Sequence, residues 1–516
     1  MKDKWLKGTI FLTITALLTK LLSMAYKIPY QNIVGDEGLY VFQQVYPLVG
    51  IYMVLSSVVL PGIISELLLK FQYNERAKVQ IQRILWTISI IVFVILFLGN
   101  DIIARVMGDR GLGDSIRWIG LLFLLLPHLS YVRGVHLTRP ETMTRVGISI
   151  TLEQFVRVAM IIFTILRFEH FNPYRIAELS YLFAMAGPLV SLLYLGFFKC
   201  QDNPKNFLQK KIRLGFYRKT IYLFLSAGIL TIFQLIDSFV VFNSLLYSGM
   251  ENLEAMQMKG VFDRGFPIIQ SATFFIGAIV SATIPQLAKA TEDQQRKNIF
   301  NYALFIVTLL SIPAAAGLFL VMGELNIALF SDNLGLQALQ IMSLQVLFYP
   351  FIVLSAAVMQ QEGRYSSMLV SILAGIFIKI MLTPYLTATL GIEGAAISSV
   401  AALGGMAAVY VIQFRKMILR NSYFNLFKIG FAVVVMWLVI DYLQPLLPQL
   451  LATDNERVFS AMGLALQVLA GMLAYGLVML LFILTTKTAP KMSRRRKRRK
   501  KIGTKNIKTI QKGRTS

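Results

Sequence analysis

Charged side chains inside long apolar stretches are the first candidates for chemistry in this sequence. Lys20, Glu153, Arg157, Asp237 and Lys379 each lie within a run of hydrophobic residues. A charge at the centre of a membrane-spanning helix costs about 2.5–3.5 kcal/mol on insertion scales, so such residues usually face a polar interior or one another. We therefore treat these five residues as functional candidates, together with Glu66 near the cytoplasmic end of the second expected span.

The spacing of these charges indicates how they are compensated. Glu153 and Arg157 are four residues apart, so they share one face of a helix and are expected to form an internal ion pair. That pair either stabilises the helix bundle or belongs to a functional site. Asp237 needs a cation, a proton or a bound ion, and the position of Lys379 in the chain makes it the expected partner.

Basic residues near the ends of two apolar stretches suggest a site for an anion. Lys20 and Lys27 lie about two helical turns apart, and Arg264 lies at the start of a later apolar run. Cationic side chains replace water around phosphate oxygens, so the three residues are expected to line one basic cavity. In the alternative interpretation, Lys27 and Arg264 only anchor helix ends at the membrane surface.

Catalytic motifs are absent from the sequence. There is no HExxH, GxSxG or GxxxxGK[ST] pattern. The single cysteine, Cys200, excludes an intramolecular disulfide. The acidic residues are scattered through separate segments, which disfavours a metal-dependent transferase. We expect no enzymatic activity, no cofactor and no metal site.

The composition is that of a membrane protein. The chain of 516 residues is 56% hydrophobic and only 15% charged, whereas soluble proteins average about 25% charged residues. Because about 20 apolar residues span a bilayer as a helix, we expect an all-α integral membrane protein with about fourteen transmembrane helices. The expected spans are 8–26, 41–68, 84–100, 118–136, 147–166, 179–198, 220–244, 266–288, 299–321, 339–360, 366–386, 394–413, 426–443 and 460–484.

The distribution of charge predicts the orientation. The chain has 51 Lys and Arg against 26 Asp and Glu, and the basic residues concentrate in alternate loops, beginning with the N-terminal one. The positive-inside rule then predicts that both termini lie on the cytoplasmic side of the membrane. The expected location is the bacterial cell membrane. The tail 485–516 is strongly basic and is expected to lie against anionic lipid. No nucleic-acid partner is expected.

The chain divides into similar halves. We expect a six-helix bundle over 1–198, a basic connector over 199–219, a second six-helix bundle over 220–413, two extra helices over 426–484 and the basic tail. A proline lies late in the second span and late in the eighth, and the fifth and eleventh spans carry Arg157 and Lys379. Such weak internal symmetry is common in secondary transporters.

Several segments together resemble the multidrug/oligosaccharidyl-lipid/polysaccharide (MOP) exporter superfamily, closest to its branch of stage V sporulation protein B-like polysaccharide transporters and lipid II flippases. They are Lys20…Lys27 with Gly35-Asp36-Glu37-Gly38-Leu39-Tyr40, Arg133-Gly134 with Glu153-Gln154-Phe155-Val156-Arg157, Gln234-Leu235-Ile236-Asp237, Asp263-Arg264 with Pro285, and Gly363…Lys379 with Gly391-Ile392-Glu393-Gly394-Ala395-Ala396.

The resemblance implies two six-helix bundles in a V around a cavity that opens alternately to each side. It implies that Lys20 and Arg264 hold the pyrophosphate of a lipid-linked glycan, with Lys27 or its neighbour Tyr26 at a further position. It also implies that helices thirteen and fourteen form a groove for the lipid tail.

One departure from the family pattern concerns ions. Some lipid II flippases bind sodium through an acid on the seventh helix and Asn or Asp on the eleventh. Here Asp237 is present, but Lys379 and Thr383 stand on the eleventh helix. We therefore hypothesise that the Lys379 ammonium takes the place of sodium.

The expected function is a flippase that moves an undecaprenyl-pyrophosphate-linked glycan, either lipid II or a wall or capsule polysaccharide unit, from the inner to the outer leaflet. The expected protein is a monomer. One alternative is a cation-coupled multidrug exporter of the same superfamily, although fourteen helices and Lys20 disfavour it. The other is a non-transporting scaffold that recruits cell-wall synthesis enzymes through the basic tail.

Overall fold

The computed structural model describes residues 26–70, 75–198, 215–281, 292–451 and 455–485, together with a few isolated positions between 11 and 23. Within these ranges every regular element is a helix. Helices satisfy all backbone hydrogen bonds within one segment, which a lipid environment demands. The predicted all-α membrane architecture is therefore confirmed.

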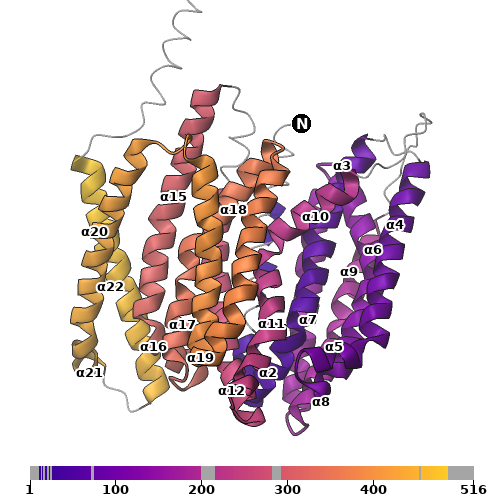
Figure 1. Cartoon of the computed structure of the whole chain (residues 1–516), viewed down its shortest axis with the longest axis horizontal. Helices are drawn as coiled ribbons and strands as arrows, with labels where there is room; N and C mark the ends of the chain where they lie inside the picture. The colour runs from indigo at the N-terminus through magenta and orange to yellow at the C-terminus, as the bar shows by residue number, and fades with distance from the viewer. Residues whose placement is uncertain are drawn as a thin grey trace, which may run out of the picture.

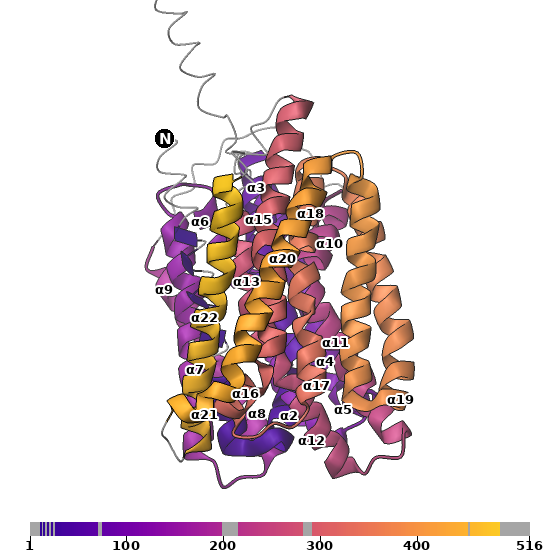
Figure 2. The ribbon, with the colours of Figure 1, turned by 90° about the vertical axis from the view of Figure 1, so that its left-hand side faces the viewer.

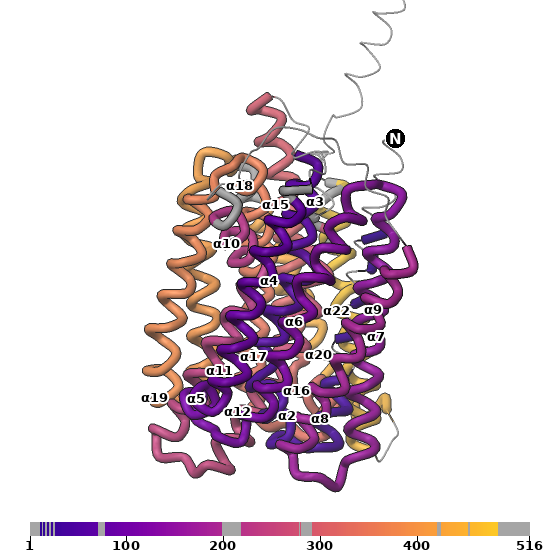
Figure 3. The backbone as a smooth tube through the Cα atoms, turned by 90° about the vertical axis from the view of Figure 1, so that its right-hand side faces the viewer, coloured from indigo at the N-terminus to yellow at the C-terminus, as the bar shows by residue number. Residues whose placement is uncertain are grey.

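The first half of the chain forms one group of helices. Its elements are α2 (Lys27–Val54), the π-helix η1 (Leu55–Val59), α3 (Leu60–Lys70), α4 (Glu75–Leu98), α5 (Asn100–Val106), η2 (Arg110–Leu112), α6 (Gly113–Leu137), α7 (Met143–Arg167), α8 (Pro173–Ala184) and α9 (Ala186–Gly196). Figure 3 shows α4, α6, α7 and α9 running side by side along the height of the molecule.

The second half continues from residue 215. Its elements are α10 (Gly215–Ala227), α11 (Ile229–Tyr247), α12 (Asn252–Asp263), α13 (Gly265–Ser281), α15 (Asp293–Leu320), α16 (Met322–Phe330), α17 (Leu336–Ser343), α18 (Gln345–Gln361), α19 (Tyr365–Phe414), α20 (Arg420–Leu443), η3 (Gln444–Leu446), α21 (Leu447–Leu450) and α22 (Glu456–Thr485). The last long helices, α20 and α22, pack together at the edge of this half (Figure 1).

Eleven helical segments in the described part of the chain are long and apolar enough to cross a membrane. One of these, α19, contains a kink at Gly391, where φ is 63°, and its two arms lie side by side (Figure 2). It therefore accommodates two of the expected spans, 366–386 and 394–413. About half of the expected first span, 8–26, lies outside the described residues, so the count of fourteen stays a prediction.

The two halves stand side by side, with α2, α11 and α12 between them (Figure 1). Helix α2 of the first half packs against both α11 and α12 of the second. We call the end of the molecule where α12 lies the lower end and the end where α15 begins the upper end, as drawn in Figure 1. The connector 199–214 and the tail 486–516 lie outside the described residues.

Helix α2 changes direction at the lower end. Gly35 adopts φ 80°, a conformation that glycine reaches without a steric penalty. The short arm before Gly35 lies across the lower end (Figure 2), and the long arm after it packs against α11, where Gln44 donates to the backbone oxygen of Ser238. This bend places Asp36 at the junction of the two halves.

Candidate functional site

Asp237 on α11 and Lys379 on α19 form a buried ion pair. Lys379 Nζ lies 2.5 Å from Asp237 Oδ1, and neither side chain is more than 1% exposed. The ammonium also donates to the hydroxyl oxygens of Ser399 at 2.6 Å and Ser398 at 3.3 Å. The cation is thus surrounded by one carboxylate and two hydroxyl oxygens.

The turn within α19 builds this ammonium site. A Cβ added at Gly394 would lie 1.9 Å from the backbone oxygen of Leu386, so only glycine allows the two arms to approach this closely. The approach brings Ser398 of the second arm opposite Lys379 of the first. Thr383 completes the contact, with its hydroxyl 3.0 Å from that of Ser398.

A second buried pair lies on α12. Lys259 Nζ is 2.5 Å from Asp263 Oδ1, and the side chains are 2% and 1% exposed. The residues are four apart, as in a helical ion pair. Lys259 was not among the residues selected from the sequence, although its spacing from Asp263 was the available signal.

A small cavity adjoins each pair. One is lined by Asp237 and the other by Lys259 and Asp263, and Gln234 and Phe266 line both. Each has a volume of about 10 Å³, roughly that needed for one water molecule. The two ion pairs therefore belong to one polar region between α2, α11, α12 and α19.

Arg264, the residue after α12, joins the two halves at the lower end. Its guanidinium bonds both oxygens of Asp36, with Nε at 2.8 Å and a terminal nitrogen at 2.5 Å. It also bonds both oxygens of Asp332, at 2.6 and 2.9 Å. Arg264 is 0% exposed. We call these three residues the Arg264 latch.

Close backbone packing supports the Arg264 latch. A Cβ added at Gly260 would lie 2.1 Å from the backbone oxygen of Asp36, so α12 touches the bend of α2 directly. Asp332 lies in the short connection between α16 and α17. Burial opposes its ionisation, but hydrogen bonds from Arg264 and from the backbone N–H of Leu334, with the charge of Arg264, hold the pKa of its carboxyl below the usual value.

A third buried cluster lies within the first half. Glu153 bonds Arg157 at 2.5 Å and Arg133 at 2.6 Å. Arg133 also donates to Ser149, Ser191 and the backbone oxygen of Ser56 in the π-helix η1. Arg133 was missed as a site residue, although it too lies inside an expected span. The cluster carries two cations and one anion.

The predicted basic residues occupy different surroundings. Lys27 is 2% exposed, and its Nζ lies 4.3 Å from the centre of the Tyr46 ring, which lines the same cavity as Lys259 and Asp263. Arg264 is held by the two carboxylates of the latch in this conformation. Lys20 lies outside the described residues.

The sequence of this chain is similar to those of several known proteins. A family model for polysaccharide biosynthesis proteins matches residues 5–291. The chain is 31% identical to the uncharacterized membrane protein YabM of Bacillus subtilis (strain 168) over 436 residues, which cover 81% of each chain. It is 22% identical to Lipid II flippase MurJ of the same organism, covering 79% of this chain and 82% of the relative. Stage V sporulation protein B, also from that organism, is 23% identical over 94% of this chain and 97% of its own.

Solved structures share the fold. The chain superposes on Lipid II flippase MurJ in an inward closed conformation with a TM-score of 0.71 at 13% identity, covering 92% of this chain and 99% of that one. An inward-facing multidrug resistance MATE family transporter gives a TM-score of 0.61 at 14% identity, covering 79% and 97%. At these identities the likeness concerns the fold alone.

Proposed function

Because the chain belongs to the polysaccharide biosynthesis protein family, in the lipid II flippase and polysaccharide transporter branch of the MOP superfamily, we propose that it moves a polyprenyl-pyrophosphate-linked glycan from the inner to the outer leaflet. The chain is a multi-pass membrane protein of the flippase or transporter type. The proposal concerns its cargo, its orientation and the residues that act.

The Arg264 latch is the observation that carries the proposal. A transporter that opens alternately to each side needs a contact that closes one side and can be released. Arg264 ties α2 of the first half to the second half and lies at the lower end. Since Asp36 and Arg264 lie 228 positions apart in the chain, this contact exists only when the halves meet there. The described structure is therefore closed at the lower end.

Charge supports an outside location for the lower end. Connections and helix starts at this end carry Asp109, Asp114, Glu251 and Glu254, whereas the turn between α19 and α20 at the upper end carries Arg415 and Lys416. The positive-inside rule then makes the upper end cytoplasmic. In this orientation the described conformation is closed to the outside.

Pyrophosphate chemistry explains how cargo binding releases the latch. A phosphate anion offers oxygens that accept the same paired N–H bonds as a carboxylate. A bound pyrophosphate therefore competes with Asp36 and Asp332 for Arg264. Once Arg264 turns to the pyrophosphate, Asp36 no longer holds α2 against α12, and the lower end opens. Lys27 and Lys20 supply further positive charge to the same anion.

The test is depletion of the protein followed by identification of the lipid-linked intermediate that accumulates in the inner leaflet. Complementation with Arg264→Gln is expected to fail at normal membrane levels of the protein, because that side chain can no longer form paired bonds with a phosphate. Arg110→Gln is the matched control, since Arg110 is exposed at the same end. Full complementation by Arg264→Gln, or no accumulation of a lipid-linked glycan, would refute the proposal.

A further inference from the structure

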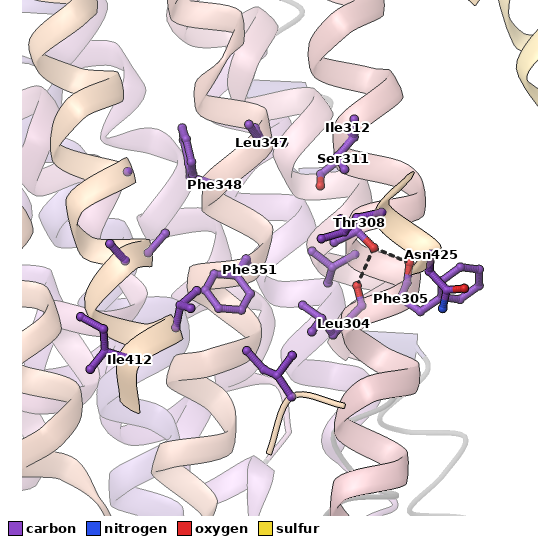
Figure 4. A pocket seen from close by; sticks show the side chains of 17 residues that line it. Leu304, Phe305, Thr308, Ser311, Ile312, Leu347, Phe348, Phe351, Ile412 and Asn425 are labelled. Carbon is purple, nitrogen blue, oxygen red and sulfur yellow. Dashed lines mark hydrogen bonds between the residues drawn. The ribbon is translucent and has the colours of Figure 1, made fainter. Parts of the chain in front are cut away.

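A large apolar cavity lies within the second half, away from the polar region described above. Its volume is about 620 Å³, and its lining comes from α15, α18, α19 and α20 together with Ile418 of the connecting turn. Figure 4 shows Phe348 and Phe351 of α18 between Ile412 of α19 and the face of α15 that carries Leu304 and Ser311. No lining residue belongs to α2, α11 or α12.

The end of this cavity near the α19–α20 turn is firmly built. Asn301 on α15 donates to the backbone oxygen of Met417 at 2.7 Å and accepts from the backbone N–H of Leu419 at 2.9 Å. Phe300 stacks on Phe414 with ring centres 4.9 Å apart. The turn is therefore fastened to α15, and the cavity does not depend on a loosely placed loop.

Polar groups are few along the cavity wall. The Thr308 hydroxyl is occupied by bonds to the backbone oxygens of Leu304 and Phe305, both at 3.0 Å (Figure 4). The remaining wall is mostly aliphatic and aromatic, so it suits a hydrocarbon chain. Its volume lies within the range of about 300–1,000 Å³ that is typical of small-molecule sites.

Positively charged side chains lie at the end of the cavity near the α19–α20 turn. Arg415 and Lys416 are exposed and lie in the sequence between Ile412 and Ile418, which both line the cavity. An exposed basic pair beside an apolar cavity matches a molecule with an anionic head and a hydrocarbon tail. The four helices that line the cavity include α20, so a bound chain would join α20 to the rest of the second half.

We propose that this cavity holds one acyl chain of an anionic phospholipid, with its phosphate at Arg415 and Lys416. The lipid is a resident component and not the cargo, because the cavity is lined by none of the helices that carry the Arg264 latch. It also has no lining residue from α22, whereas the groove expected for the cargo's tail lies between helices thirteen and fourteen, α20 and α22. The proposal does not depend on which glycan is transported, nor on the flippase function itself.

The experiment uses the full chain in nanodiscs with phosphatidylglycerol that carries a photoreactive diazirine at the end of one acyl chain. Labelled peptides are mapped by mass spectrometry. Labelling is expected on the lining segments of α15, α18, α19 and α20. The double variant Gly404→Leu/Ala408→Leu fills the cavity and is expected to lower that labelling at least tenfold. The control is Gly430→Leu, since Gly430 on α20 has open space around it.

Two further measurements test whether the acyl chain in the cavity belongs to an anionic lipid. The same diazirine chain on phosphatidylcholine is expected to label the cavity at least fivefold less, and Arg415→Gln/Lys416→Gln is expected to remove that difference. This second variant alters only exposed side chains, so it keeps the test valid if the cavity-filling variant misfolds. Equal labelling by both lipids, unchanged labelling in the filled and correctly folded variant, or displacement of the probe by equimolar undecaprenyl phosphate would each overturn the proposal.

Discussion

Lys379 and Asp237 lie 142 positions apart in the chain, yet their charged atoms are 2.5 Å apart and almost fully buried. Each charge is costly alone in this setting, and each compensates the other. Ser398 and Ser399 add hydroxyl contacts to the ammonium. Lys379 is therefore the counter-ion of Asp237 in this structure.

Removal of one member of this pair is expected to destabilise the protein strongly. Lys379→Met leaves a buried carboxylate without its cation, and the loss should be about 3–5 kcal/mol. The double variant Asp237→Asn/Lys379→Met removes both charges and should recover most of that loss. Unfolding in mild detergent measures both. The single variant Asp237→Asn completes the comparison. If the loss in the double variant equals the sum of the losses in Lys379→Met and Asp237→Asn, the two residues do not interact.

Transport is expected to proceed without sodium, because the Lys379 ammonium already neutralises Asp237. Flippase activity or substrate affinity should be the same after sodium is replaced by choline. The measurement is made on the wild type and on Asp237→Asn. A saturable sodium requirement that disappears in Asp237→Asn would contradict this hypothesis.

Loss of the Arg264 latch is expected to open the lower end. Spin labels at Arg110→Cys and Gln337→Cys report the distance between the halves, in a background where Cys200→Ser removes the single native cysteine. Arg264→Gln should add a population with longer distances, because a neutral amide cannot hold two carboxylates together. Asp332→Asn should have a smaller effect, since Asp36 still binds the guanidinium. Identical distance distributions in all three proteins would exclude a latch role.

The latch should respond to acid and not to alkali. The pKa of Asp332 is lower in the closed state than the reference value of about 3.9. A carboxyl with a depressed pKa contributes its stabilisation above the reference value and loses it as the pH falls through the depressed value. The same spin-label pair should therefore report a constant closed population between about pH 5 and about pH 8. It should report opening of the lower end only below about pH 4. Opening near neutral pH would require another titrating group.

Glu153 is expected to matter more for stability than either of its arginine partners. Arg133→Gln or Arg157→Gln leaves Glu153 paired with the remaining guanidinium, so the cost should be about 1–3 kcal/mol, as for lost hydrogen bonds to a buried group. Glu153→Gln leaves two buried guanidinium groups without a counter-charge, and the cost should be about 3–5 kcal/mol. Thermal unfolding of the three variants measures the order. A Glu153→Gln protein as stable as the two arginine variants would refute this account.

The sequence alone determined the class of the protein and which side chains needed explanation. Long apolar runs predict helices because only hydrogen-bonded helical backbone is tolerated in lipid, and the described residues are helical as expected. The spacing of Glu153 and Arg157 predicted that they share a face, since a helix of known pitch relates positions four apart. The cost of buried charge singled out Asp237 and Lys379.

Tertiary structure decided which charge meets which. Arg264 finds Asp36 and Asp332 only because α2 bends at Gly35 and because the connection between α16 and α17 reaches the same end of the molecule. Arg133 joins Glu153 through the packing of α6 against α7. Burial makes a partner necessary, but it does not select one, because that choice depends on how distant helices pack. The apolar cavity between α15, α18, α19 and α20 likewise has no signal along the chain, since hydrophobic residues that line a cavity and those that fill a core look the same in sequence.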